Sequence, residues 1–160
     1  MSLHAPSETV RVQAAMFGSS SLTTQAVFGA QASLMVATRP GGYHSAPHFH
    51  ECEQLNLLQA GEIWVFVEDE AYHLRPGDFM RIPAGAVHWA WNRSTEACSL
   101  VEVHSPGLQA DPTVAEVAVG LLREGESVPT GDGPTNTLVF VGGGGFDPSI
   151  AEAKSEARAS

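Results

Sequence analysis

Residues 42–61 read GYHSAPHFHECEQLNLLQAG, and residues 77–92 read GDFMRIPAGAVHWAWN. In the first stretch, His48 and His50 are two positions apart, so their side chains face the same side of an extended strand. Gln54 keeps that parity. The sequence therefore places two imidazoles and an amide on one side of the chain.

Short apolar segments separated by turn residues surround these stretches. Strands are expected at residues 32–38, 62–67, 71–74, 79–82, 88–92 and 99–104. Turn residues such as Pro76-Gly77-Asp78 and Pro83-Ala84-Gly85 lie between them. Many short strands at this spacing predict an all-β sandwich or barrel.

Polar groups inside such a barrel are costly unless a partner satisfies them. A divalent metal ion does this well. Imidazole is a ligand for Zn, Cu, Fe and Ni, and oxygen donors extend the range to Mn. We therefore expect one divalent metal ion, with Zn, Ni, Mn and Fe as the candidates.

The region beyond the strands predicts one helix and one further strand. Asp111 is a suitable N-cap, Pro112 fits the first turn, and Gly125 ends the segment. Apolar residues recur between them at helical spacing, so the helix should pack on the outside of the barrel. Residues 137–141 form the expected strand, which pairs either within its own chain or with a neighbouring copy.

The expected organisation has four parts. They are an N-terminal arm with the first strands (1–29), the barrel core (30–108), the helix and last strand (109–145), and a polar tail (146–160).

The two quoted stretches resemble the motifs of the cupin family. The first cupin motif is G-x5-H-x-H-x(3,4)-E-x6-G, which Gly42, His48, His50 and Gly61 fit with Gln54 in place of the Glu. The second is G-x5-P-x-G-x2-H-x3-N, and residues 77–92 match it at every fixed position. The resemblance implies a double-stranded β-helix, the jelly-roll or RmlC-like cupin barrel, over about residues 30–105.

The resemblance also implies the ligands of the metal. His48, His50 and His88 match the three metal histidines, and Gln54 matches the carboxylate ligand. An amide oxygen is a poorer donor than a carboxylate. Glu53, in case a bulge shifts the register, and a water molecule therefore remain alternatives to Gln54 as the fourth ligand. Asn92 is interpreted as structural.

Catalytic candidates are Glu102, His104 and His44. Glu102 and His104 share one face of a strand, and either is an acid or base candidate if that face points inward. His44 is interpreted as a residue of the pocket rim or as a plain loop histidine. Arg81 precedes the turn at Pro83, where it could hold a substrate carboxylate or lie on the surface.

Three functions are compatible with this site. The first is a metal-dependent enzyme with isomerase, cyclase or lyase chemistry on a small oxygenated organic molecule, because neutral ligands leave the metal strongly Lewis acidic. The second is an Fe-, Mn- or Ni-dependent dioxygenase resembling quercetinase-like cupins. The third is a barrel that binds a metabolite or sugar without catalysis.

Composition excludes several partners. The chain has 18 acidic and 8 basic residues and a net charge of -10, which disfavours nucleic acid and anionic lipid as binding partners.

No signal peptide and no apolar run of membrane-spanning length is seen, so the cytoplasm is expected. Cys52 and Cys98 are expected to be reduced, packed side chains. A homodimer is expected from the resemblance and from the need to cover edge strands.

Overall fold

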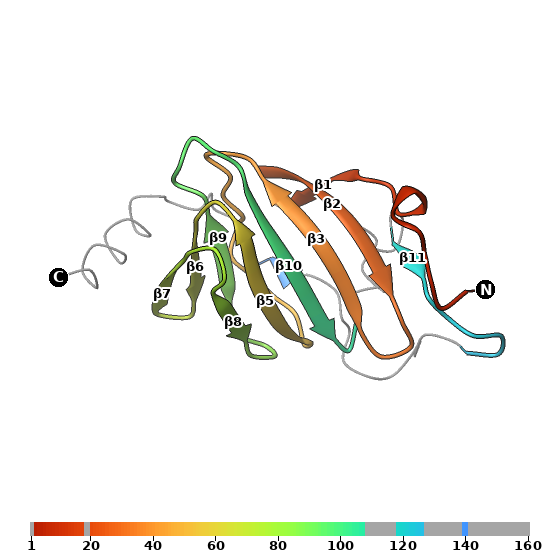
Figure 1. The fold of residues 1–160 in the computed structure, drawn as a ribbon. Coiled ribbons are helices and arrows are strands. Elements are labelled where there is room, and N and C mark those ends of the chain that lie inside the picture. The colour runs from red at the N-terminus through yellow and green to blue at the C-terminus, as the bar shows by residue number, and fades with distance from the viewer. Residues whose placement is uncertain (1, 18–19, 108–117, 127–138, 141–160) are drawn as a thin grey trace.

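The computed structural model describes residues 2–17, 20–107, 118–126 and 139–140, and these residues form two facing antiparallel β-sheets (Figure 1). In chain order the described elements are the 3-10 turn η1 (Ser7–Thr9) and the strands β1 (Gln13–Phe17), β2 (Ser20–Phe28), β3 (Ser33–Arg39), β4 (His48–Phe49), β5 (Glu53–Ala60), β6 (Ile63–Val67), β7 (Glu70–Leu74), β8 (Phe79–Ile82), β9 (His88–Trp91), β10 (Cys98–Ser105), β11 (Val119–Gly120) and β12 (Val139–Phe140). The all-β barrel predicted from the strand spacing is confirmed.

The sheets are built from strands that are distant in sequence. One sheet has the order β1-β2-β3-β10-β5-β8, with β11 attached to β2, and the other has the order β12-β4-β9-β6-β7. Strand β10 pairs with both β3 and β5, and β4 reaches β9 through the pair His48 and His88. Between β3 and β10 the chain passes repeatedly from one sheet to the other, which is the jelly-roll arrangement, and the pairing of β4 with β9 brings the two histidine-bearing stretches together.

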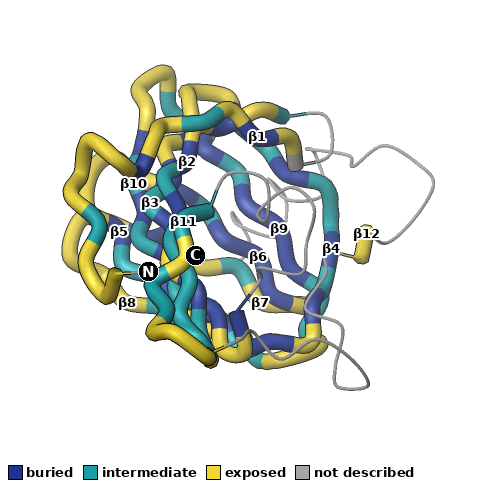
Figure 2. Tube along the Cα trace, turned by 90° about the vertical axis from the view of Figure 1, so that its right-hand side faces the viewer, coloured by how far each residue is buried: buried dark blue, intermediate teal, exposed yellow. Residues whose placement is uncertain are grey.

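Alternating burial shows which side of each strand faces the interior. In β3 and β10 every second residue is buried, as expected for strands with one face on a core. Figure 2 shows buried positions interspersed with less buried ones along the strands of both sheets. The largest apolar cluster lies between the sheets and includes Leu58, Ile63, Ile82 and Leu100, each at most 1% exposed. Burial of one such side chain stabilises the fold by about 1.5–3 kcal/mol.

A second, aromatic cluster involves the residues of β6 and β9 that alternate with the inward ones. Phe66 and Trp89 stack with ring centroids 5.1 Å apart, and Trp64 and Trp91 pack against them. Trp89 and Trp91 flank Ala90, which belongs to the core between the sheets. The two tryptophans thus anchor β9 while His88 points to the other side of the strand.

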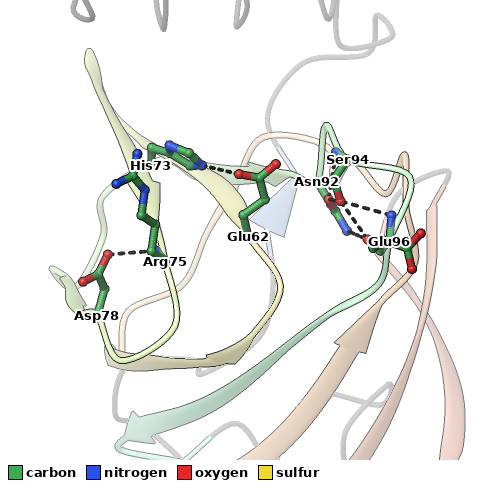
Figure 3. A network of polar contacts seen from close by, with 7 residues as sticks. All are labelled: Glu62, His73, Arg75, Asp78, Asn92, Ser94 and Glu96. Atoms are coloured by element: carbon green, nitrogen blue, oxygen red, sulfur yellow. Dashed lines mark hydrogen bonds and ion pairs between the residues drawn. The ribbon is translucent and has the colours of Figure 1, made fainter.

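Two tight connections hold the histidine-bearing segments. Gly85 has a φ of 76°, and its N–H donates to the carbonyl of His50 over 2.8 Å. The side-chain amide of Asn92 lies 2.8–3.3 Å from the carbonyls of Arg39, Pro40 and Glu96. Figure 3 shows its contact with Glu96. Asn92 therefore has the structural position expected of it.

Both cysteines are free and buried. Cys52 packs with Ala26 and Met35, and Cys98 belongs to the main core. Burial raises the pKa of the Cys52 thiol to about 12, so this thiol keeps its proton near neutral pH.

The helix expected after the barrel is not observed in the part of that segment that the structure describes, residues 118–126. Residues 111–117 lie outside the described residues, but Val119 and Gly120 form β11, which pairs in parallel with Val27 and Phe28 of β2. The prediction of helix at residues 118–125 is therefore wrong, because backbone pairing with the open edge of β2 outweighs a helical pattern of apolar residues. Among the described residues, no helix is long and apolar enough to cross a membrane.

The strand expected at residues 137–141 is present at Val139–Phe140. It pairs with Phe49 and His48 of β4 in the same chain. Of the two expected arrangements of this strand, pairing within its own chain and pairing with a neighbouring copy, the structure shows the first. The other residues of the expected strand lie outside the described residues.

Candidate metal centre

Three histidines converge between the sheets. His48 lies on β4, His50 directly follows that strand, and His88 opens β9 opposite His48. Their rings are 4.3–6.2 Å apart between centroids, and one ring nitrogen from each lies within 4.8 Å of the others. All three are at most 7% exposed. The three buried histidines that sequence analysis selected could therefore hold a metal ion.

Each of these histidines is oriented by a backbone carbonyl at Nδ1. The acceptors are the carbonyls of Ala46 for His48 (2.8 Å), Cys52 for His50 (2.9 Å) and Ala86 for His88 (2.9 Å). A proton on Nδ1 leaves the lone pair of Nε2 free to bind a metal, which is the usual second-shell pattern of metal histidines. The local backbone thus prepares the ligand nitrogens.

The rings of His48 and His88 are also kept neutral, as metal ligands must be. Burial lowers the pKa of His48 to about 4, and burial together with the neighbouring His48 lowers that of His88 to about 2. The low pKa values have a physical cause, since three imidazolium ions cannot share one dry cavity.

Gln54 lies on β5 beside His50, and it is buried. Its Oε1 lies 3.1 Å from Nε2 of His50. Its Nε2 donates to Oδ1 of Asn56 over 2.8 Å and faces Oε2 of Glu102 at 3.4 Å. The amide is therefore held with its oxygen toward His50, where this oxygen could join the three imidazole nitrogens as a donor to a divalent metal ion.

Glu53, the alternative to Gln54 as the fourth ligand, lies on the outer surface of the barrel. Arg81, which the sequence left as either a substrate-binding or a surface residue, lies beside it there. Arg81 donates to the carboxylate of Glu53 over 2.6 Å, and their side chains are 61% and 42% exposed. The strand keeps its regular alternation at this point, so Gln54 and not Glu53 lies beside the histidines. Arg81 has the surface position that the sequence left open.

Glu102 and His104 point inward from β10 and line the cavity. Burial alone would raise the pKa of Glu102, but the guanidinium of Arg39, which donates to its Oε1, holds the pKa below its usual range. Glu102 is therefore a carboxylate that is already paired. The inward orientation, one of the two that the sequence allowed, is the observed one.

His104 is neutral and close to the ligands. Its ring meets that of His50 edge to face at 5.4 Å between centroids. Burial lowers its pKa to about 3, although the charge of Glu102 opposes that shift. Its Nδ1 is buried and has no hydrogen-bond partner among the residues that the structure describes.

His44 is not brought into this group. Tyr43 and Ser45 on either side of it line the cavity, but His44 does not. Its ring packs edge to face on Trp91, 5.9 Å between centroids, and is half-buried. His44 therefore lies outside the lining of the cavity that the three histidines border.

Sequence reasoning missed Arg39, the partner of Glu102. Arg39 is only 8% exposed, lies against the ring of Tyr43 at 5.3 Å, and lines the cavity. The signal was present in the strand, since Arg39 shares the parity of the buried residues Met35 and Ala37. A charged residue at an inward position predicts a paired partner inside.

The cavity enclosed by these residues has a volume of about 30 Å³. Its polar lining consists of Arg39, Tyr43, Ser45, His48, His50, Gln54, Asn56, His88, Glu102 and His104. A space of this size accepts an ion and a water-sized group.

Comparisons with known proteins agree with this architecture. Residues 34–104 match the family model described as the cupin domain. No curated protein matches the chain.

Among solved structures, an RmlC-like cupin from Shewanella frigidimarina NCIMB 400 is 21% identical, with 64% of this chain and 88% of that chain covered and a TM-score of 0.57. KdgF from Halomonas sp. is 21% identical, with 63% and 90% covered and a TM-score of 0.55. A sugar phosphate isomerase of the cupin superfamily from Silicibacter pomeroyi DSS-3 is 14% identical, with 64% and 74% covered and a TM-score of 0.56.

At these identities the likeness shows the fold alone. The matched residues contain both histidine-bearing motifs and the strands that carry the inward ligands. Residues 34–104 of this chain are therefore a cupin domain of the cupin superfamily.

Proposed function

We propose that this protein is a metal-dependent enzyme that acts on a small oxygenated organic molecule by isomerase, cyclase or lyase chemistry. His48, His50, His88 and Gln54 would hold the metal. The observation that carries the proposal is the convergence of three buried imidazoles, each fixed at Nδ1 by a backbone carbonyl. A divalent ion in such a set polarises a carbonyl or hydroxyl oxygen and lowers the pKa of bound water.

The charges around the cavity support an anionic oxygen as the binding group. All four proposed ligands are neutral, and Glu102, the carboxylate that lines the cavity, is already paired with Arg39. No described side chain of the cavity lining is left to balance the metal charge. An enolate, enediolate or carboxylate oxygen of the substrate would supply that balance, which favours Lewis-acid chemistry over simple storage of a neutral metabolite.

His104 is the proposed group that holds or moves a proton. Its imidazole is neutral, its Nδ1 has no described partner, and it lies beside His50. The nearby carboxylate of Glu102 would stabilise the imidazolium that forms when His104 takes up a proton. Glu102 is proposed to act through that charge, because its own oxygen accepts from Arg39.

Metal content tests the proposal first. We expect about one equivalent of Zn, Ni, Mn or Fe by elemental analysis, with loss of the metal in His50→Ala and weakened binding in Gln54→Ala. His73→Ala is the matched control, because His73 lies outside the cavity and pairs with Glu62 at 2.8 Å (Figure 3). Failure to bind any of these ions after anaerobic reconstitution would overturn the proposal.

The Ni²⁺-loaded protein then allows a test of the anionic oxygen. Acetohydroxamate, a chelating anion, should change the Ni²⁺ absorption spectrum at micromolar to millimolar concentration, whereas neutral acetamide should not. Equal responses to both would contradict the charge argument. Oxygen consumption with a flavonol by the Fe or Ni form would identify the dioxygenase alternative instead.

The homodimer and the cytoplasmic location remain predictions.

A further inference from the structure

One contact distinguishes His50 from the other two histidines. Its Nδ1 lies 2.9 Å from the carbonyl oxygen of Cys52 and 3.2 Å from the Sγ of the same residue. On the other side of the ring, Nε2 lies 3.1 Å from Oε1 of Gln54. The carbonyl of Cys52 can thus accept from the Nδ1–H tautomer, whereas the thiol of Cys52 as a donor and the amide oxygen of Gln54 as an acceptor pair with the Nε2–H tautomer.

The amide of Gln54 cannot turn round to relieve the contact with His50. Its nitrogen faces Oδ1 of Asn56 at 2.8 Å and the carboxylate of Glu102 at 3.4 Å. A flipped amide would direct its oxygen at two other oxygens, which is unfavourable. Oε1 of Gln54 therefore stays directed at Nε2 of His50, where an acceptor requires either a proton or a cation.

These constraints make the preferred tautomer depend on the metal. With a proton on Nδ1, His50 donates to the carbonyl of Cys52 and offers the Nε2 lone pair to a metal. Without a metal, that lone pair would oppose the lone pairs of Gln54 Oε1 across 3.1 Å. A proton on Nε2 removes this repulsion by donating to Gln54. The lone pair of Nδ1 then faces the carbonyl oxygen of Cys52 at 2.9 Å, and the S–H that the thiol of Cys52 donates to Nδ1 offsets that contact.

We propose that Cys52 is a positioning residue that lets His50 exchange tautomers: Nε2–H in the metal-free protein and Nδ1–H when the metal is bound. Both tautomers are forms of the neutral imidazole, so the exchange between them takes up or releases no net proton. The thiol partners Nδ1 in the metal-free state, and the Cys52 carbonyl partners it in the bound state. This inference rests on the proposed metal site.

The tautomers can be observed directly by two-bond ¹H–¹⁵N correlation spectra of protein with ¹⁵N-labelled histidine at pH 7.5. In the metal-free protein we expect His50 to show Nε2–H while His48 and His88 show Nδ1–H. Addition of one equivalent of Zn²⁺ should convert His50 to Nδ1–H. Assignment follows from loss of one spin system in His50→Gln. Detection of Nδ1–H at His50 before Zn²⁺ is added would overturn the proposal.

Substitution of Cys52 separates a positioning role from simple packing. Cys52→Ala removes the S–H donor, so metal-free His50 should move toward Nδ1–H and Zn²⁺ should bind about two- to tenfold more tightly. Cys52→Ser keeps a donor of similar size and should retain Nε2–H, with unchanged or weaker Zn²⁺ binding. A packing role would weaken binding in both variants. Cys98→Ser, another buried cysteine, is the matched control and should change neither property.

Gln54→Leu gives a second test if Cys52→Ala does not fold. It removes the acceptor at Nε2, so metal-free His50 should shift to Nδ1–H, and persistence of Nε2–H would contradict the inference. The tautomer of the metal-free protein does not depend on metal binding. Absence of Zn²⁺ binding would therefore disprove the proposed function, whereas the wrong metal-free tautomer would disprove only the role of Cys52.

Discussion

The guanidinium of Arg39 donates from Nη2 to Oε1 of Glu102 inside the barrel, where their side chains are only 10% and 6% exposed. The pair joins the end of β3 to the middle of β10. Glu102 also faces the side-chain amide of Gln54, so the ion pair lies directly beside the proposed fourth metal ligand. Its disruption should therefore affect both stability and metal binding.

Removal of Arg39 should destabilise the protein strongly. Arg39→Met leaves the carboxylate of Glu102 buried without its partner, and we expect a loss of about 3–5 kcal/mol in the free energy of unfolding, measured with urea. The double variant Arg39→Met/Glu102→Leu removes both charges and should recover most of that loss. Equal losses in the single and double variants would show that packing, not charge, dominates.

Replacement of Gln54 by Glu should separate metal affinity from the binding of anions. The added carboxylate strengthens the donor set, so Zn²⁺ should bind more tightly, while its negative charge should weaken acetohydroxamate binding to the Ni²⁺ form by about tenfold or more. Calorimetry with Zn²⁺ and absorption titration with acetohydroxamate measure the two effects. The conservative control is Gln59→Glu at an exposed position of the same strand. Stronger anion binding in Gln54→Glu would contradict the charge argument.

The metal-free protein should lose stability as the pH falls below about 6.5. The folded-state pKa values are about 4 for His48, about 2 for His88 and about 3 for His104, all below the value of 6.5 for an exposed histidine. Between pH 6.5 and 4 the unfolded chain binds more protons, so each buried histidine lowers the free energy of unfolding by at most about 1.4 kcal/mol per pH unit.

Urea denaturation of EDTA-treated protein at several pH values measures that slope. His104→Gln should reduce it, whereas His73→Ala on the surface should not. Zn²⁺ should raise the free energy of unfolding at each pH without reducing the slope, because the metal binds the folded protein, in which the imidazoles of His48 and His88 are already neutral over this range. A flat stability profile between pH 6.5 and 4 would contradict the burial of neutral imidazoles.

Gly61 should not tolerate a side chain. Its φ is 74°, and a Cβ would lie 2.7 Å from the carbonyl oxygen of Ala97 and 2.8 Å from Cβ of Cys98. Gly61→Ala should therefore lower the free energy of unfolding by at least about 1–3 kcal/mol. Gly29→Ala is the control, because its nearest neighbour would be 4.0 Å away. Thermal unfolding of the two variants distinguishes them, and equal midpoints would refute the steric argument.

Much of this protein was predictable from local patterns. The spacing of residues 42–61 and 77–92, with turn residues between short apolar segments, predicted an all-β barrel and the histidines that converge in it. Such patterns are informative because alternation along a strand and tight turns are local properties of the backbone. The strand at residues 79–82 even has the expected bounds.

Other features needed the tertiary structure, because they depend on which strands become neighbours. The inward position of Glu102 follows from its register opposite Met35 of β3 and Asn56 of β5. Val119–Gly120 form a strand because they pair with the edge of β2, although the local pattern of apolar residues is helical.

The sequence by itself determined which side chains share a face: His48 with His50 and Gln54, and Glu102 with His104. Only the tertiary structure decided that both faces point into one cavity, that Arg39 neutralises Glu102 there, and that Cys52 meets the ring of His50. The physical reason is that parity along a strand comes from the backbone alone. The inward side and the partners of each polar group are decided by long-range pairing between sheets.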